Sequence, residues 1–220
     1  LSGKLLPLRG ILPIALLARS LGLKLIAPAA NINEIKIIDG LEYYVFDNLS
    51  GVINYIIKKE YFPQANLTKS RAGNSEEKSN GPDLKDVIGQ SYARRALEIA
   101  AAGSHAIMMK GVPGSGKTML SNCLPQILPP MNFEESLEVS KIYSISGLLK
   151  SDRLVEKRAF RAPHHTISEA AMVGGSKIPK PGEVSLAHNG VLFLDEFTEY
   201  KKSVLEALRQ PLSDGSVTIS

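Results

Sequence analysis

Apolar side chains in residues 1–60 recur with two different periods, which predicts a mixture of helices and strands. The helical period gives one helix an apolar face made by Ile14, Leu17, Ala18 and Leu21. It gives a second helix a face made by Leu49, Val52, Ile53, Ile56 and Ile57. Short apolar runs at 24–27 and 43–46 predict strands.

Between the two predicted strands, Asn31 and Glu34 have the spacing of a capping box. This spacing predicts a short helix that continues through Ile38. Residues 1–60 are therefore expected to form a small α/β piece. We expect this piece to lack its beginning, because so few strands seldom close a core.

Residues 61–82 change the pattern. They are rich in Asn, Ser, Gly, Lys and Glu and carry almost no apolar surface, which is typical of a flexible linker. We therefore predict a partial domain at 1–60, a linker at 61–82 and a second domain at 83–220. The two flanking modules are expected to move relative to each other.

From Asp83 onward, helical and strand patterns alternate again. The predicted helices cover 93–101, 119–124, 133–149 and 204–212, and the predicted strands cover 106–109, 190–194 and 216–220. Residues 158–183 contain more Pro, Gly and His than a regular element tolerates. They predict a structured loop or a hairpin insertion.

Composition narrows the functional class only slightly. The chain has 220 residues, of which 44% are hydrophobic and 22% charged, and its net charge of +4 is not a nucleic-acid footprint by itself. A lone Cys123 cannot form an intrachain disulfide, which fits a reducing cytoplasm. No apolar run is long enough to span a membrane. The start at Leu1 has no secretory signature, so we expect a cut rather than a signal peptide.

The most specific stretch of the chain fits G-x-x-x-x-G-K-[ST], the phosphate-binding P-loop or Walker A motif. Its residues are Gly111, Val112, Pro113, Gly114, Ser115, Gly116, Lys117 and Thr118. The predicted strand before it and the helix from Met119 give the context that the motif requires. Glycines let successive N–H groups face phosphate oxygens, and the helix N-terminus adds a favourable dipole. We expect these residues and Met119 to bind ATP.

Two acidic residues follow the apolar run Val191–Leu194, in the Walker B pattern. Within this reading, Lys117 reaches the β- and γ-phosphates, and the Thr118 hydroxyl ligates Mg²⁺. Asp195 holds Mg²⁺ through water, and Glu196 orients the attacking water. Lys117 and Glu196 are thus the expected catalytic residues, and Thr118 and Asp195 the expected metal ligands.

Longer strings resemble the magnesium-chelatase-like branch of the AAA+ ATPases. They are 86–90, 93–103, 160–168, 173–175, 181–190 and 205–212, which with the P-loop cover residues 83–220 nearly throughout. The resemblance implies a P-loop AAA+ parallel sheet flanked by helices. It also implies a homo-hexameric ring in the cytoplasm that uses ATP and Mg²⁺.

Residues 1–10 and 28–31 resemble the end of a Lon-protease-like domain with an S5-like α/β fold. That domain ahead of a chelatase-like ATPase is the arrangement of the ComM (YifB-like) competence family. The family implies a DNA branch-migration helicase that acts on branched or single-stranded DNA in natural transformation, with no membrane partner. Peptidase activity is not expected, because Gly10 is followed by Ile11 and Leu12 where active Lon-type domains carry a lysine.

Several alternatives stay open. A chelatase-type ATPase that drives metal insertion or remodels a protein partner shares the same core. The pair His164–His165 invites a metal-site interpretation, although no further His or Cys spacing supports one. The residues given also end before a sensor, a lid and an arginine finger could appear. Since an arginine finger contributes roughly 10³–10⁵ in rate, the fragment itself is expected to be nearly inactive.

Overall fold

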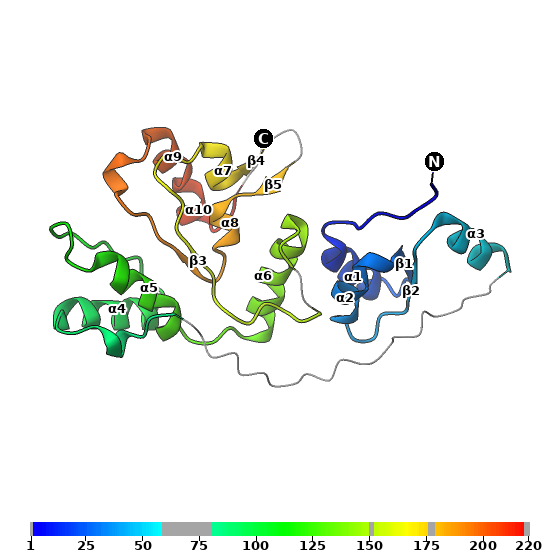
Figure 1. The fold of residues 1–220 in the computed structure, drawn as a ribbon, viewed down its shortest axis with the longest axis horizontal. Coiled ribbons are helices and arrows are strands. Elements are labelled where there is room, and N and C mark those ends of the chain that lie inside the picture. Colours follow the sequence, from blue (N-terminus) through cyan, green and yellow to red (C-terminus); the bar gives the residue numbers. More distant parts are fainter. Residues whose placement is uncertain (1, 59–80, 150–151, 176–178, 218–220) are drawn as a thin grey trace. The chain divides into compact units, whose positions relative to one another are not determined.

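The computed structural model describes residues 2–58, 81–149, 152–175 and 179–217 (Figure 1). Its elements form two compact units, one within residues 1–75 and 136–155 and the other within 76–135 and 156–220. The predicted linker at 61–82 lies almost wholly outside the described residues. The predicted domain boundaries stay a prediction, but residues 136–155, which they assign to the second domain, pack with the first unit.

The first unit is a small α/β arrangement built on one parallel strand pair. Its elements are α1 (Ile11–Ser20), β1 (Leu25–Pro28), η1 (Ala29–Asn31), α2 (Ile32–Lys36), β2 (Tyr43–Phe46), α3 (Leu49–Lys58) and most of α6 (Phe133–Ser146). Strands β1 and β2 pair in register from Leu25 opposite Tyr43 to Pro28 opposite Phe46. Both strands match the predicted positions closely.

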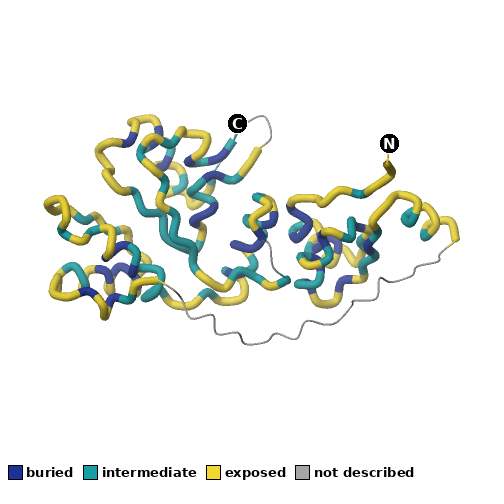
Figure 2. The backbone as a smooth tube through the Cα atoms, in the orientation of Figure 1, coloured by how far each residue is buried: buried dark blue, intermediate teal, exposed yellow. Residues whose placement is uncertain are grey.

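Helix α1 buries a different face from the one predicted. Its buried residues are Ile11, Leu12, Ala15 and Ala18. Leu17 and Leu21 are instead 59% and 61% exposed, so the predicted face is wrong apart from Ala18. The helix is apolar almost all round, and a period of 3.6 residues cannot then decide which side packs. The face of α3 is also exposed, and Figure 2 shows no buried position along that helix.

The predicted capping box at Asn31 is wrong. The Asn31 side chain makes no cap bond to α2. Its amide instead donates to the Leu8 carbonyl at 2.7 Å and accepts from the Leu8 N–H at 2.8 Å. Glu34 accepts a hydrogen bond from the Ser144 hydroxyl of α6. The side chains of Asn31 and Glu34 therefore bond to residues distant in sequence instead of to the start of α2.

Buried serines explain why α6 packs with the first unit. Ser140 and Ser144 are 0% and 1% exposed, and each both donates and accepts a hydrogen bond. The Ser144 hydroxyl accepts from the Leu12 N–H at 3.3 Å, and its carbonyl accepts from the Gly10 N–H at 3.0 Å. Burying a hydroxyl without a hydrogen-bond partner is costly, so these bonds favour the packing of α6 with the first unit.

The second unit contains two separate strand pairs and several short helices. Its elements are η2 (Leu84–Asp86), α4 (Ser91–Gly103), α5 (Lys117–Ile127), β3 (Phe160–Arg161), α7 (Glu169–Val173), β4 (Gly174–Gly175), β5 (Lys180–Pro181), α8 (Glu183–Leu186), β6 (Val191–Leu192), η3 (Phe197–Glu199), α9 (Lys202–Ala207) and α10 (Arg209–Asp214). Strands β3 and β6 are parallel, whereas β4 and β5 are antiparallel. The mixed α/β class with parallel pairing is confirmed.

Two apolar clusters hold the second unit together. One lies between α4 and α5, which Figure 1 shows side by side, and contains Leu97, Leu120 and the buried Cys123. The other joins α7 to α9 and contains Met172 and Val204. The first cluster therefore packs against α5, and the second packs against β6.

Some predicted elements of this unit need correction. Residues 106–109 form no strand, although Ile107 and Met109 pack on the first cluster. The single helix predicted at 204–212 is broken at Leu208 into α9 and α10. Of the two alternatives for 158–183, the antiparallel pair of β4 and β5 favours the hairpin, whereas the helix α7 was not predicted. Most of the predicted strand at 216–220 lies outside the described residues. None of the helices described is long and apolar enough to cross a membrane.

Candidate functional site

The Walker A segment forms a tight loop that leads directly into α5. Gly114 and Gly116 adopt φ values of 76° and 81°, in the left-handed region that glycine enters without strain. Gly116 immediately precedes Lys117, the first residue of α5. The loop is exposed except for the half-buried Ser115 and Lys117, so its backbone N–H groups at the helix N-terminus are accessible to an anion.

The Lys117 ammonium group lies against its own loop. Nζ donates to the carbonyl oxygens of Gly111 and Val112 at 2.9 and 3.0 Å, and it lies 3.4 Å from Oγ of Ser115. A phosphate in the loop would offer this ammonium stronger, charged acceptors than these neutral carbonyls. The side chain is therefore placed for the predicted phosphate contact.

Gln90 is a residue at this loop to which the sequence alone gave no role. Its side-chain amide donates to the Ser115 carbonyl at 2.9 Å. Gln90 itself has a φ of 54°, in the left-handed region, and directly precedes α4. The start of α4 is thus tied to the phosphate loop, which helps to keep the loop in one conformation.

The two predicted metal ligands lie together, although they are 77 positions apart in sequence. Oγ1 of Thr118, in the first turn of α5, is 3.3 Å from Oδ2 of Asp195, just beyond β6. A hydroxyl and a carboxylate are hard oxygen ligands of the type that Mg²⁺ prefers. The residues present therefore fit a magnesium ion beside the phosphate loop.

Glu196 occupies a constrained position next to this pair. Its φ of 51° is unusual for a non-glycine residue, and its backbone N–H donates to Oδ1 of Asp195 at 2.9 Å. The Glu196 side chain is 64% exposed, and its Oε2 lies 3.1 Å from Nδ1 of His165. The carboxylate predicted to orient water is therefore held by a second residue.

His165 reaches Glu196 from the loop that follows β3, the strand paired with β6. Its ring lies 4.0 Å from the ring of His164, whose Nδ1 is 2.9 Å from Oγ1 of Thr166. The contact with Glu196 was missed by the sequence analysis, which considered these histidines as a metal site. Within the described residues, no group of three or more His, Cys, Asp or Glu side chains could hold a metal.

Tyr200 supports the loop that carries His164 and His165. Its side chain is 5% exposed, and its hydroxyl donates to the Pro163 carbonyl at 2.5 Å. Burial, with a smaller contribution from the Asp195 carboxylate, raises the pKa of Tyr200. The hydroxyl therefore remains a hydrogen-bond donor at all ordinary pH values.

The other predicted nucleotide contacts lie at the surface of the same site. Val112 is 73% exposed at the loop, and Met119 is 45% exposed on α5. Gly111 lies close to Ser115, since a Cβ on it would be 3.0 Å from Oγ of that serine. The structure thus brings all nine predicted nucleotide contacts, both metal ligands and Glu196 to one region of the second unit.

The chain is similar to several known proteins. The family described as magnesium chelatase, subunit ChlI, matches residues 83–220. Competence protein ComM of Haemophilus influenzae is 43% identical over 221 residues, which cover 100% of this chain and 43% of that protein. YifB of Escherichia coli is 39% identical over 220 residues, 100% of this chain and 42% of YifB.

A more distant relative shares only part of the chain. The magnesium-chelatase 67 kDa subunit of Chlorobaculum tepidum is 24% identical over 136 residues, which cover 61% of this chain and 19% of that subunit. The chain spans less than half the length of the ComM and YifB proteins that it matches.

Proposed function

Because this chain belongs to the magnesium chelatase subunit ChlI family of AAA+-type ATPases, as a ComM/YifB-like member, we propose that it binds and hydrolyses ATP in a ComM-type motor. The observation that carries the proposal is the 3.3 Å approach of Thr118 to Asp195. Two motifs far apart in sequence meet there, next to a phosphate-binding loop.

Each site residue has a distinct task in this proposal. The loop N–H groups and Lys117 bind the phosphates and offset their charge. Thr118 and Asp195 would hold Mg²⁺, which would supply positive charge beside the phosphates. Glu196 accepts a hydrogen bond from the attacking water and orients it towards the γ-phosphate. Since phosphoryl transfer depends mostly on positioning, these fixed side chains supply the main catalytic effect.

His165 would restrain the water-orienting carboxylate. Its 3.1 Å contact limits the positions open to a Glu196 side chain that is otherwise largely exposed. Tyr200 in turn fixes the loop that carries His165. A carboxylate held in this way loses less conformational freedom when it engages water.

We further propose that the ATPase works as a cytoplasmic homo-hexamer that moves branched or single-stranded DNA. The support is the similarity to ComM over the whole of this chain, because ComM is named as a competence protein. We interpret residues 1–60 as part of a Lon-protease-like domain without peptidase activity. Ile11 and Leu12, which follow Gly10, are both buried apolar residues and offer no amine to activate a nucleophile.

The alternative is an ATPase that drives metal insertion or remodels a protein partner. It is favoured by the similarity to the magnesium-chelatase 67 kDa subunit over 136 residues. Both functions use the same nucleotide site, so they differ in what stimulates turnover rather than in the chemistry of hydrolysis.

Steady-state ATP hydrolysis by the complete natural polypeptide, with and without four-way-junction DNA, separates these functions. We expect the junction to stimulate turnover in the wild-type protein, and Lys117→Ala to abolish both basal and stimulated turnover. Basal turnover that no DNA changes would shift the assignment to the partner-driven ATPase. Turnover that survives in Lys117→Ala would contradict the nucleotide site itself.

A further inference from the structure

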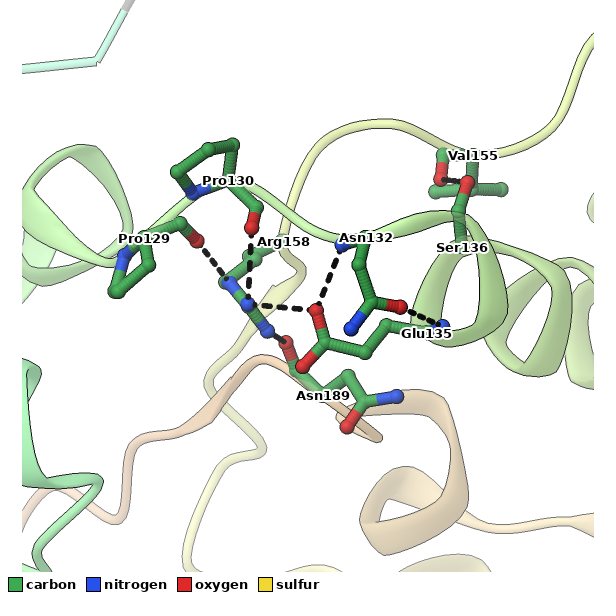
Figure 3. A network of polar contacts seen from close by, with 8 residues as sticks. All are labelled: Pro129, Pro130, Asn132, Glu135, Ser136, Val155, Arg158 and Asn189. Atoms are coloured by element: carbon green, nitrogen blue, oxygen red, sulfur yellow. Dashed lines mark hydrogen bonds and ion pairs between the residues drawn. The ribbon is translucent and has the colours of Figure 1, made fainter.

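Arg158 is a mostly buried guanidinium that the proposed hydrolysis does not use. Its side chain is 13% exposed, and Figure 3 shows it bonded to groups from separate segments. Nε donates to the Pro129 carbonyl and Nη1 to the Asn189 carbonyl, both at 2.6 Å. Nη2 donates to Oε2 of Glu135 at 3.0 Å and lies 3.5 Å from the Pro130 carbonyl. The guanidinium is therefore held from several directions.

One group of these partners follows the Walker A helix. Helix α5 ends at Ile127, and Pro129 and Pro130 come directly after its C-terminal cap. Pro129 is followed by another proline, which disfavours the α region and so restricts the ψ angle that sets the direction of the Pro129 carbonyl. Glu135 is itself fixed, because its Oε2 accepts from the Asn132 N–H at 2.9 Å while its own N–H donates to Oδ1 of Asn132.

The other partner precedes the Walker B strand. Asn189 has a φ of 53° and lies in the turn before β6. The adjoining backbone is tightly packed, because a Cβ on Gly190 would lie 2.4 Å from the Ala159 carbonyl oxygen. That same oxygen accepts from the Val191 N–H at 2.7 Å. Arg158 thus joins the segment that follows the Walker A helix to the turn that precedes the Walker B strand.

We propose that Arg158 is a positioning residue that aligns the Walker A helix with the Walker B strand. Thr118 and Asp195 lie at the opposite ends of these two elements from the Arg158 contacts. A tilt between the elements would therefore appear as misalignment of the two metal ligands. The inference rests on the proposed ATPase function and adds a residue that acts through Thr118 and Asp195.

The arrangement needs a planar, multiply donating group. A guanidinium donates in several fixed directions, whereas a lysine ammonium is a compact charge on a flexible stem. Arg158→Lys would keep the charge beside Glu135 but would replace donors in fixed directions with one compact ammonium group, which fits the Pro129 and Asn189 carbonyls less well. This substitution removes the alignment and preserves the electrostatics.

The test compares nucleotide binding with and without the metal in the complete natural polypeptide. A fluorescent ATP analogue is titrated in EDTA and then in excess Mg²⁺, and steady-state hydrolysis is measured in parallel. In Arg158→Lys we expect unchanged affinity in EDTA, since the phosphate loop is intact. We expect the gain in affinity on adding Mg²⁺ to shrink and kcat to fall by about 10–100-fold, the scale of small misplacements at a reacting centre.

Arg161→Lys is the matched control. Arg161 lies three positions further along the chain, in β3, and its guanidinium forms a bidentate pair with Glu183 at 2.6 and 2.7 Å. We expect this variant to keep the full Mg²⁺-dependent gain. Should Arg158→Lys fold poorly, Glu135→Gln removes the charged partner of Arg158 and should reduce the same gain to a smaller extent.

Each outcome decides the inference. Wild-type kcat and a wild-type Mg²⁺ gain in Arg158→Lys would overturn it. So would equal losses of EDTA affinity, Mg²⁺ gain and thermal stability in Arg158→Lys and Arg161→Lys, because that result describes a purely structural role. A wild-type protein that binds no ATP would overturn the proposed function first, and is distinguished by the wild-type titration alone.

Discussion

Replacing Gly190 with alanine tests how closely β3 and β6 must approach for the site to form. The new methyl group would lie 2.4 Å from the carbonyl oxygen of Ala159 and 2.8 Å from its nitrogen. Both are backbone atoms, so no side-chain rotation can relieve the overlap. The β3 segment must move away, which strains the 2.7 Å bond from the Val191 N–H to the Ala159 carbonyl.

The size of the effect follows from two contributions. Forcing an extra carbon into a packed site costs about 1–3 kcal/mol, and weakening one backbone hydrogen bond costs about 1 kcal/mol. We therefore expect Gly190→Ala to lower the free energy of unfolding by about 2–4 kcal/mol. Because Asp195 and Glu196 follow the same strand, ATP hydrolysis should fall as well.

Gly103→Ala is the matched control for this prediction. A methyl group on Gly103 would lie 2.3 Å from Nε2 of His105, an equally short distance. That atom is the end of an exposed side chain, which can rotate away. Gly103 is also the last residue of α4, where alanine is the better helix former by up to about 1 kcal/mol. We expect no loss of stability.

Denaturant unfolding of both variants, beside steady-state ATP hydrolysis, measures the difference. The reasoning predicts that the unfolding midpoint falls in Gly190→Ala and stays constant or rises in Gly103→Ala. Equal midpoints in the two variants would refute it, since the argument depends on backbone atoms being unable to yield where a side chain can.

Three further predictions concern single side chains of the second unit. Glu196→Gln should retain ATP binding but slow hydrolysis by at least about 100-fold, the usual worth of a positioned base; normal single-turnover rates would contradict the assignment. Tyr200→Phe should cost about 1 kcal/mol in denaturant unfolding, because it removes the donor to the Pro163 carbonyl; an unchanged midpoint would show that bond to be dispensable. Burial, with smaller contributions from nearby carboxylates, raises the pKa of the Cys123 thiol. It should react with a thiol reagent at pH 8 far more slowly in native than in denatured protein, and rapid native labelling would contradict its burial. A raised pKa also means that this thiol stabilises the fold below its ordinary pKa and that the contribution is lost as the pH rises through the folded-state value.

The nucleotide motifs were predictable from the sequence because their chemistry is local. The glycines of 111–116 and the Lys117–Thr118 pair are adjacent in the chain, and the backbone conformation they need follows from glycine itself. Asp195 and Glu196 directly follow the apolar run Val191–Leu194, so this motif is also local in sequence. The sequence also located β1 and β2 correctly.

The pattern of apolar residues did not decide which face of a helix is buried or which partner a polar side chain bonds to. Contacts with residues distant in sequence decided both. Several sides of α1 are apolar, and only packing selected Ile11, Leu12 and Ala15 for burial. Asn31 had a local cap available, yet its amide bonds to Leu8, 23 positions away.

The tertiary structure alone assigned roles to Arg158, His165 and Gln90. In sequence each is an ordinary polar residue in a loop or at the start of an element, with no motif that reveals its contact. The contacts depend on which segments pack side by side: the turn before β6 against the segment before β3, and the loop after β3 against Glu196. The chemistry of each motif is thus determined by residues that are neighbours in sequence. The alignment of the motifs depends on the fold, because it requires groups that only packing brings within hydrogen-bond distance.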